Sequence, residues 1–342
     1  MSSKKIVACI VTFNRKEKLK NCIEALLAQI YTDFKIVIVD NASTDGTQSS
    51  LAEYIKDKKI EYYNTGKNLG GAGGFNYAIK NVVFSFDYIW IMDDDTYPKP
   101  DALQNIVKHI GDVNDRFGFF SSLTEWTDGN ACLMNKQALE DDIFGSMRVL
   151  EAGLIPAKNA SFVSLFIKSD MVKKVGLPIK DFFLWGDDTE YTQRLSVYGG
   201  YIATDSVVIH DMATNDGVDI LNSDFKRVQR YSLFVRNRMF IAKLSGNKGE
   251  MIRAYISPFK QCIRVFFKAK DNRIGRMKIT IEGFWKGGFS RAAARLPALW
   301  SENCACGRRD SARQPRRTGQ RSAPGSRTAR QAAARPAARR RG

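Results

Sequence analysis

The chain has 342 residues, of which 44% are hydrophobic, enough to bury the core of one large α/β domain or two smaller ones. Its net charge of +17 is uneven, because residues 290–342 hold 14 of the 53 bases and only two of the 36 acids. Residues 1–289 therefore carry an excess of only +5, which argues against a nucleic-acid-binding protein. No apolar run approaches the ~20 residues of a membrane span. The six cysteines show neither disulfide nor zinc spacing, so we expect a reducing, cytoplasmic compartment.

The composition divides the chain into three parts. Residues 1–222 read as an α/β domain, residues 223–289 as a basic, aromatic helical region, and residues 290–342 as a low-complexity tail rich in Arg and Ala. The tail has too few large apolar residues to order itself, and its switch from Lys to Arg suggests a non-native coding origin. The alternative is a basic arm that binds nucleic acid or anionic lipid.

Two apolar runs near the N-terminus, residues 5–13 and 34–39, predict buried strands joined by an amphipathic helix. Polar residues close each run, Thr12 and Asn14 after the first and Asp40 after the second. A strand, a crossover helix and a parallel strand place both carboxyl ends at one edge of the sheet. We therefore expect these polar side chains to cluster.

A glycine-rich segment follows at residues 68–76, with the sequence NLGGAGGFN. Glycines let the backbone approach a ligand closely, and the amides at the start of the next helix favour anions. The alternative is a turn that serves tight packing only.

The most informative run is residues 88–92, five apolar residues that predict a strand buried on both faces. It ends in three carboxylates, Asp93, Asp94 and Asp95. Adjacent acids repel one another, and a divalent cation that prefers oxygen ligands would remove this cost. The alternative is a solvated acidic turn before Pro98.

Further strands are expected at residues 118–123 and 161–167, with a hairpin at Asp128-Gly129 and an irregular segment over 138–158. A second acidic motif follows, in which the apolar residues 182–185 lead into Asp187 and Asp188. A carboxylate beside an aromatic wall has the setting of a general base. The alternative is that one of the two acids caps the following helix.

A last strand, residues 201–209, ends at His210. An imidazole there could complete a metal site, or it could be purely structural. Residues 225–289 alternate aromatic residues with Lys and Arg. This pattern suits either helices that cap the α/β domain or helices that lie on an anionic membrane surface.

Taken together, five motifs resemble the family-2 glycosyltransferases: VTFNR (11–15), IVDNASTDGT (38–47), NLGGAGGFN (68–76), MDDD (92–95) and WGDDTEY (185–191). The resemblance covers about residues 5–240. It implies the GT-A fold, a Rossmann-like α/β architecture with a mostly parallel central sheet flanked by helices and, here, a C-terminal helical region. It also implies an inverting, metal-dependent transfer of a sugar from a nucleoside diphosphate.

The resemblance assigns roles residue by residue. The nucleotide-sugar pocket would be formed by Thr12, Asn14, Arg15, Asp40, Asn68, Gly74 and Asp94. Mn²⁺ or Mg²⁺ would be held by Asp93, Asp95 and His210. Asp188, paired with Asp187, would be the catalytic base, and Trp185 would contact the acceptor.

Within the family, the motifs are similar to those of bacterial galactofuranosyltransferases, which use UDP-galactofuranose. The implied acceptor is a glycan or lipid-linked glycan of cell-surface polysaccharide biosynthesis, reached from the cytoplasm or the inner face of the membrane. Two alternatives remain: a rhamnosyltransferase that uses dTDP-rhamnose, and a nucleotide-sugar-binding protein without transfer activity. A nucleic-acid partner is not expected.

Overall fold

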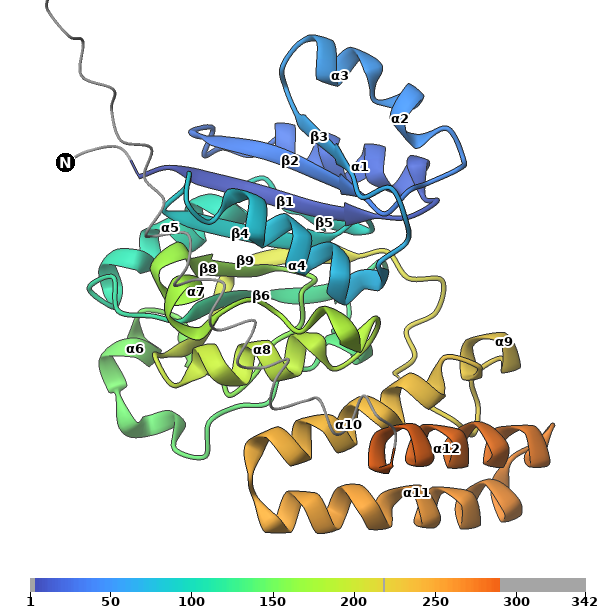
Figure 1. Cartoon of the computed structure of the whole chain (residues 1–342). Coiled ribbons are helices and arrows are strands. Elements are labelled where there is room, and N and C mark those ends of the chain that lie inside the picture. The colour runs from blue at the N-terminus through green and yellow to red at the C-terminus, as the bar shows by residue number, and fades with distance from the viewer. Residues whose placement is uncertain (1–3, 218, 290–342) are drawn as a thin grey trace, which may run out of the picture.

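The computed structural model describes residues 4–217 and 219–289 (Figure 1). It shows an α/β domain built on one twisted sheet and, below it in the figure, a layer of C-terminal helices. The tail at residues 290–342 lies outside the described residues.

The sheet has nine strands in the order β3-β2-β1-β4-β8-β6-β9-β5, and β7 pairs with β9. The strands are β1 (Ile6–Thr12), β2 (Phe34–Asp40), β3 (Glu61–Asn64), β4 (Tyr88–Asp93), β5 (Thr96–Pro98), β6 (Phe119–Trp126), β7 (Leu154–Pro156), β8 (Leu165–Lys168) and β9 (Gly200–His210). Parallel pairs join β3-β2-β1-β4 and β6-β9, and these make up most of the ladder. Because β8 is antiparallel to both β4 and β6, the strands β1, β2, β4 and β9 all end at the same edge.

Helices cover both faces of the sheet, which explains why all seven residues of β1 are buried although successive side chains point to opposite faces. On one face, Ile6, Ala8 and Ile10 belong to a buried cluster with side chains of α1 (Lys16–Leu27) and α5 (Ala102–Asp112). On the other, Val7 and Cys9 belong to a buried cluster with side chains of α4 (Gly70–Val82) and α8 (Asp187–Ser196). The remaining short helices of this domain are α2 (Thr47–Ser50), α3 (Ala52–Lys56), α6 (Met147–Glu151), α7 (Ser169–Val175), η1 (Leu133–Asn135), η2 (Ile143–Gly145) and η3 (Lys180–Phe182).

The expected α/β fold with a mostly parallel sheet is confirmed, and residues 88–92 are buried on both faces. Two local expectations are wrong. The strand predicted from residue 161 begins at Leu165, because residues 162–164 form a turn. The segment 138–158 is not irregular throughout, because it contains α6 and β7. The hairpin at Asp128-Gly129 is confirmed as a short one, with an antiparallel bridge between Glu125 and Ala131 and a hydrogen bond of 2.8 Å from the amide of Trp126 to the carbonyl of Asn130.

Four helices form the C-terminal layer: α9 (Phe225–Val228), α10 (Tyr231–Ser245), α11 (Lys248–Lys268) and α12 (Arg273–Gly288). Helix α10 packs on both sides, since Phe240 joins a buried cluster with Phe182 of the α/β domain while Val235 packs in a cluster with Val265 of α11. The layer is thus attached to the α/β domain through α10. Among the described residues, none of the helices combines the length and the apolar character needed to cross a membrane.

Candidate active site

The acidic turn is brought to His210 by strand pairing. Strand β4 ends at Asp93, and β5 starts three residues later at Thr96. Because β5 runs antiparallel to β9, Thr96 pairs with His210, and the backbone amide of Asp211 donates to the carbonyl of Asp95 over 2.9 Å. Two segments more than a hundred residues apart in sequence therefore meet at the carboxyl-terminal edge of the sheet.

Asp93, Asp95 and His210 form a cluster whose ligand atoms lie within 4.8 Å of one another. The Nε2 atom of His210 is 3.2 Å from Oδ1 of Asp95. Its Nδ1 donates to Oδ1 of Asn135 over 2.7 Å, while the amide of Asn135 donates to Ser161 over 3.0 Å. This arrangement points Nε2 towards the carboxylates, as in histidines that bind metals with their other nitrogen held by a hydrogen bond.

The donor set suits a divalent cation. Carboxylates favour Mg²⁺ and Mn²⁺, while an imidazole is a poorer ligand for Mg²⁺ than for a transition metal. Two carboxylates and one imidazole therefore fit Mn²⁺ better than Mg²⁺. These three residues form the candidate metal site.

Protein cations also reach the acidic turn, which corrects one expectation from the sequence. Arg15 donates to Asp94 over 3.2 Å and to Asp95 over 2.7 Å, and Lys18 lies 3.9 Å from Asp95. Thr12 donates to Asp94 over 2.7 Å. Repulsion among unpaired acids is therefore not evidence for a metal; the case for a metal rests on the donor geometry of the candidate metal site.

The protonation of the cluster follows from burial and charge. Burial, aided by the charge of Asp95, raises the pKa of Asp93 to about 7. Burial also raises the pKa of Asp94 to about 6, although Arg15 opposes it. For Asp95, burial is outweighed by the hydrogen bond and charge of His210, so its pKa falls. Burial of His210 is in turn outweighed by Asp95, which raises the pKa of the imidazole to about 10.

The second acidic motif starts helix α8. Gly186, at φ 88°, occupies the cap position, and Asp187 and Asp188 are the first two residues of the helix. Neither acid is the N-cap residue, although Oδ1 of Asp188 accepts from the backbone amide of Thr189 in the first turn over 2.7 Å. Burial raises the pKa of both carboxyls, and for Asp187 the charge of Asp188 adds to the effect.

The loop before α8 is held in an unusual conformation by helix α10. Phe183 and Trp185 have positive φ angles of 63° and 65°, which side-chain-bearing residues rarely adopt. The buried amide of Asn237 donates to the carbonyls of Phe182, Leu184 and Trp185 over 3.0, 2.9 and 2.6 Å. Helix α10 thus fixes the loop that carries Trp185.

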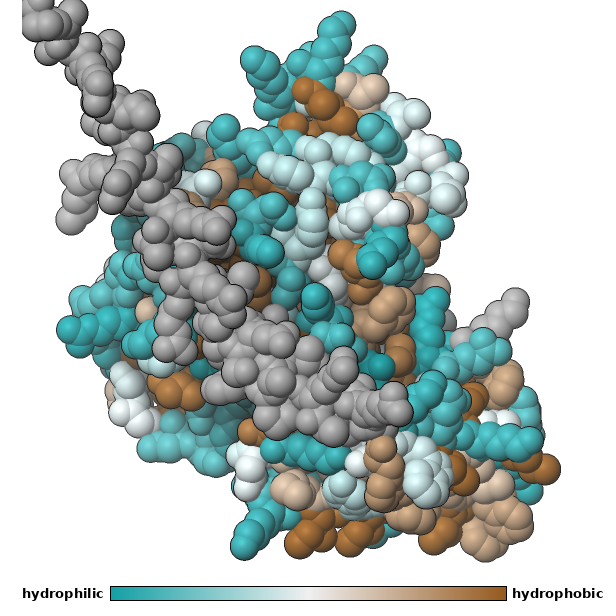
Figure 2. All heavy atoms as spheres, viewed as in Figure 1, coloured by the Kyte–Doolittle hydropathy of each residue, from teal (hydrophilic) through white to brown (hydrophobic). Residues whose placement is uncertain are grey.

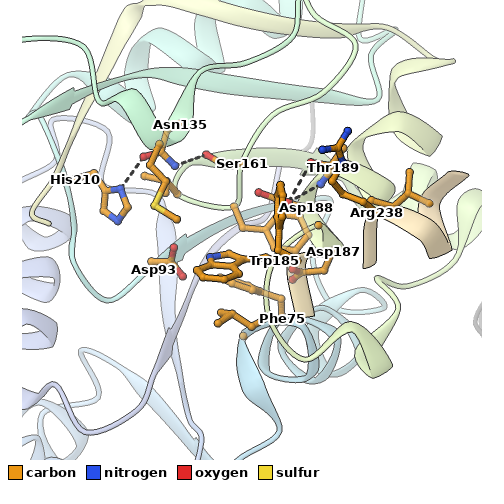
Figure 3. Close-up of a pocket in the computed structure, with 18 residues that line it drawn as sticks. Phe75, Asp93, Asn135, Ser161, Trp185, Asp187, Asp188, Thr189, His210 and Arg238 are labelled. Atoms are coloured by element: carbon orange, nitrogen blue, oxygen red, sulfur yellow. Dashed lines mark hydrogen bonds between the residues drawn. The ribbon is translucent and has the colours of Figure 1, made fainter. Parts of the chain in front are cut away.

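One cavity of about 400 Å³ is shared by both acidic motifs. Asp93 and His210 line it from one side and Asp187 and Asp188 from the other, and Figure 3 shows Trp185 between them in this view. Its remaining lining residues are Gly71, Phe75, Met134, Asn135, Ser161, Phe162, Val163, Leu184, Gly186, Thr189, Phe234, Arg238 and Ile241. A carboxylate pair thus faces a candidate cation site across a space large enough for a sugar.

The polar ends of β1 and β2 lie at the same edge and are tied to each other. Asp40 is buried and accepts from Tyr62 over 2.6 Å and from the backbone amide of Ser43 over 2.8 Å. Oδ1 of Asn14 accepts from the amide of Thr44 over 2.7 Å. The predicted clustering of these residues is confirmed, whereas their contact with a nucleotide stays a prediction.

The residues of the glycine-rich segment 68–76 serve different purposes. Asn68 is exposed and accepts from the amide of Gly70 over 2.8 Å at the start of α4. A Cβ atom at Gly74 would lie 2.4 Å from Cγ1 of Val11. Gly74 therefore allows close packing of α4 on the sheet, while its contact with the nucleotide stays a prediction. Gly71 lines the cavity.

Sequence reasoning missed Asn135, Ser161, Lys18 and Asn237. Asn135 ends the short helix η1 and Ser161 lies just before a turn, and neither belongs to a motif. Phe234 and Arg238 were noticed as part of a basic aromatic region, but nothing in that pattern places them on a cavity. Their spacing of four residues on α10 is the one available signal, because it puts both on one helix face.

Comparison with known proteins agrees with this architecture. Residues 7–122 match the model of Glycosyl transferase family 2. An uncharacterized glycosyltransferase of Rickettsia typhi is 25% identical over 268 residues, which cover 76% of this chain and 78% of that protein. The galactofuranosyltransferase GlfT1 of Mycolicibacterium smegmatis is 22% identical over 199 residues, 56% of this chain and 65% of that protein.

Among solved structures, that of GalNAc-T7 with UDP, GalNAc and Mn²⁺ matches with a TM-score of 0.58. The match covers 87% of this chain and 58% of that one, at 12% sequence identity. At this identity the likeness establishes the GT-A fold alone.

Proposed function

We propose that this chain, an enzyme of glycosyltransferase family 2, transfers galactofuranose from UDP-galactofuranose to a hydroxyl group of a glycan, with inversion at the sugar. The observation that carries the proposal is the shared cavity, in which Asp93 and His210 face Asp187 and Asp188. An inverting transfer needs a cation at the leaving diphosphate and a base at the incoming hydroxyl, on opposite sides of the sugar.

The donor's diphosphate would lie at the candidate metal site. Asp93, Asp95 and His210 would hold Mn²⁺, which when bound neutralises the charge that develops on the departing diphosphate. Arg15, about half exposed while it pairs with Asp94 and Asp95, would be able to exchange those carboxylates for a phosphate oxygen.

The nucleoside would lie along the ends of β1 and β2. Asp40, Asn14 and Thr12 offer hydrogen-bonding groups there, and Asn68 stands at the exposed start of α4. This placement would direct the sugar from the sheet edge into the cavity, where Gly71 leaves room beside Phe75.

Asp188 would remove the proton of the acceptor hydroxyl. It lines the cavity and is partly exposed, whereas Asp187 is buried. Its raised pKa makes it a stronger base than an ordinary aspartate while leaving it ionised above that pKa. The hydroxyl oxygen then bonds to the anomeric carbon as the bond to the diphosphate oxygen breaks, which needs no covalent sugar–enzyme intermediate. The indole of Trp185 would hold the acceptor sugar.

The choice of galactofuranose rests on the motifs and on the similarity to GlfT1. The test is to incubate the protein with UDP-galactofuranose or with dTDP-rhamnose, each with Mn²⁺ and again with EDTA, and to measure release of the nucleoside diphosphate. We expect Mn²⁺-dependent release of UDP from the first donor. Release of dTDP would indicate a rhamnosyltransferase instead. If the protein bound UDP tightly but neither released a nucleoside diphosphate from either donor nor transferred sugar to a glycan, it would be a nucleotide-sugar-binding protein.

A further inference from the structure

Helices α11 and α12 present an apolar surface with no counterpart in the proposed catalysis. Ala254, Pro258 and Val265 of α11 are buried towards the rest of the helical layer. Its opposite side carries large apolar residues that are 46–71% exposed: Ile252, Ile256, Phe259, Ile263, Phe266 and Phe267. Their spacing of three and four residues places them on one helix face. Figure 2 shows this hydrophobic band along the lower edge of the molecule, over α11.

Helix α12 extends the same surface. Ile274, Ile281 and Trp285 are 66%, 47% and 58% exposed. The two helices meet at a ring contact, because Phe284 of α12 lies 5.1 Å from Phe259 of α11, centroid to centroid. Within α12, the rings of Phe284 and Trp285 are 6.3 Å apart. At the other end, Phe266 and Ile274 line one hollow. We call the six exposed residues of α11 and these three of α12 the α11–α12 face.

Cations border the α11–α12 face. Lys260, Arg264 and Lys268 each directly follow an apolar member of the face on α11, so a row of positive charge runs beside the apolar row. Within the described chain, these three cations form no ion pair. Residues 248–289 contain ten bases and three acids, a net of +7, which leaves residues 1–247 with a net of −2. The positive charge of the described chain is therefore concentrated where the apolar residues are exposed.

We propose that the α11–α12 face docks on the surface of an anionic lipid bilayer. An exposed apolar helix face with a basic border is the pattern of helices that lie in the membrane interface, where Phe and Trp enter the acyl boundary and Lys and Arg contact anionic head groups. A second copy of the chain is a poor alternative, because two such faces would bring charges of +7 together.

Docking would also bear on the active site, because α10 packs against α11 and α12 and lines the cavity with Phe234, Arg238 and Ile241. Only helix α10 would then lie between the membrane surface and the cavity. A glycan attached to a membrane lipid could reach the cavity across this distance. The inference goes beyond the proposed function and does not depend on which sugar is transferred.

The test measures binding of the full chain to sedimented vesicles. One set is phosphatidylcholine alone and the other contains 30% phosphatidylglycerol, both at ~0.1 M salt where charges act over about 10 Å. The test variant is Ile263→Asn with Phe267→Asn. The matched control is Ile30→Asn with Val197→Asn, two apolar residues that are 61% and 79% exposed on the α/β domain.

We expect the unmodified chain to bind the anionic vesicles at least tenfold more tightly than the neutral ones. The test variant should bind the anionic vesicles about tenfold or more weakly than the unmodified chain, and the control should bind them as tightly as the unmodified chain. If the test variant bound the anionic vesicles as tightly as the unmodified chain, the proposal would be overturned. The affinity would then belong to the Arg-rich residues 290–342 or to another surface. A second result would also overturn the proposal. If sedimentation velocity showed a concentration-dependent dimer that became a monomer in Ile263→Asn, a second copy of the chain would be what covers the face.

Discussion

Asn237 ties the C-terminal helices to the active site, and its substitution tests whether α10 positions Trp185. In Asn237→Ala, the carbonyls of Leu184 and Trp185 lose their partner, while that of Phe182 keeps Arg236 at 2.7 Å. Two half-buried carbonyls left unpaired cost about 1–2 kcal/mol each. The strained φ angles at Phe183 and Trp185 would favour a relaxed loop further, by roughly 1–3 kcal/mol each.

These magnitudes predict that the loop leaves its native conformation in most molecules. We expect kcat for sugar transfer to fall on the order of 100-fold, since 1.4 kcal/mol corresponds to a factor of ten. Mn²⁺-dependent binding of UDP should stay within about twofold of the unmodified protein, because Asn237 contacts the loop before α8 rather than the candidate metal site.

The assay pairs steady-state transfer with calorimetric titration of UDP. Asn81→Ala is the matched control, because Asn81 also donates to a backbone carbonyl, that of Tyr77, but is exposed on α4, away from the cavity. Transfer by Asn237→Ala at the rate of Asn81→Ala, with a lowered melting temperature, would refute the positioning role and leave Asn237 as a structural residue.

Two further predictions concern packing and pH. Gly74→Ala should lower the free energy of unfolding in urea by about 1–3 kcal/mol, because its Cβ would clash with Val11, whereas Gly111→Ala on α5 meets nothing within 4 Å and should be neutral or stabilising. Equal stabilities for the two variants would contradict this packing. For pH, kcat should rise as pH increases through the raised pKa of the Asp187–Asp188 pair and then level off, because the base acts only when ionised. A rate that stays flat down to the ordinary aspartate pKa of about 3.9 would show that neither carboxyl is a buried base.

The strands that build the site could be predicted from the sequence because their signals are local. The runs at β1, β2 and β4 are continuously apolar and end in polar residues, which indicates parallel strands with a functional edge. Apolar runs that end in acids marked Asp93 and Asp188 as candidate site residues, and both line one cavity.

What the sequence could not reveal depends on contacts between distant segments. The pairing of β5 with β9 brings His210 to Asp95, but a three-residue strand has no recognisable pattern. Strand β8 is too short to indicate that it runs antiparallel between β4 and β6. Asn237 looks like any helical asparagine until its three carbonyl partners are seen.

The central claim is that a cation site and a base face each other across the cavity. It is tested most directly by measuring both UDP binding with Mn²⁺ and sugar transfer in two variants, Asp93→Asn and Asp188→Asn. We predict that Asp93→Asn loses at least tenfold in Mn²⁺-dependent UDP affinity. Asp188→Asn should bind UDP normally and transfer sugar about 100- to 10,000-fold more slowly. Near-normal transfer by Asp188→Asn, or undiminished Mn²⁺-dependent binding by Asp93→Asn, would contradict the claim.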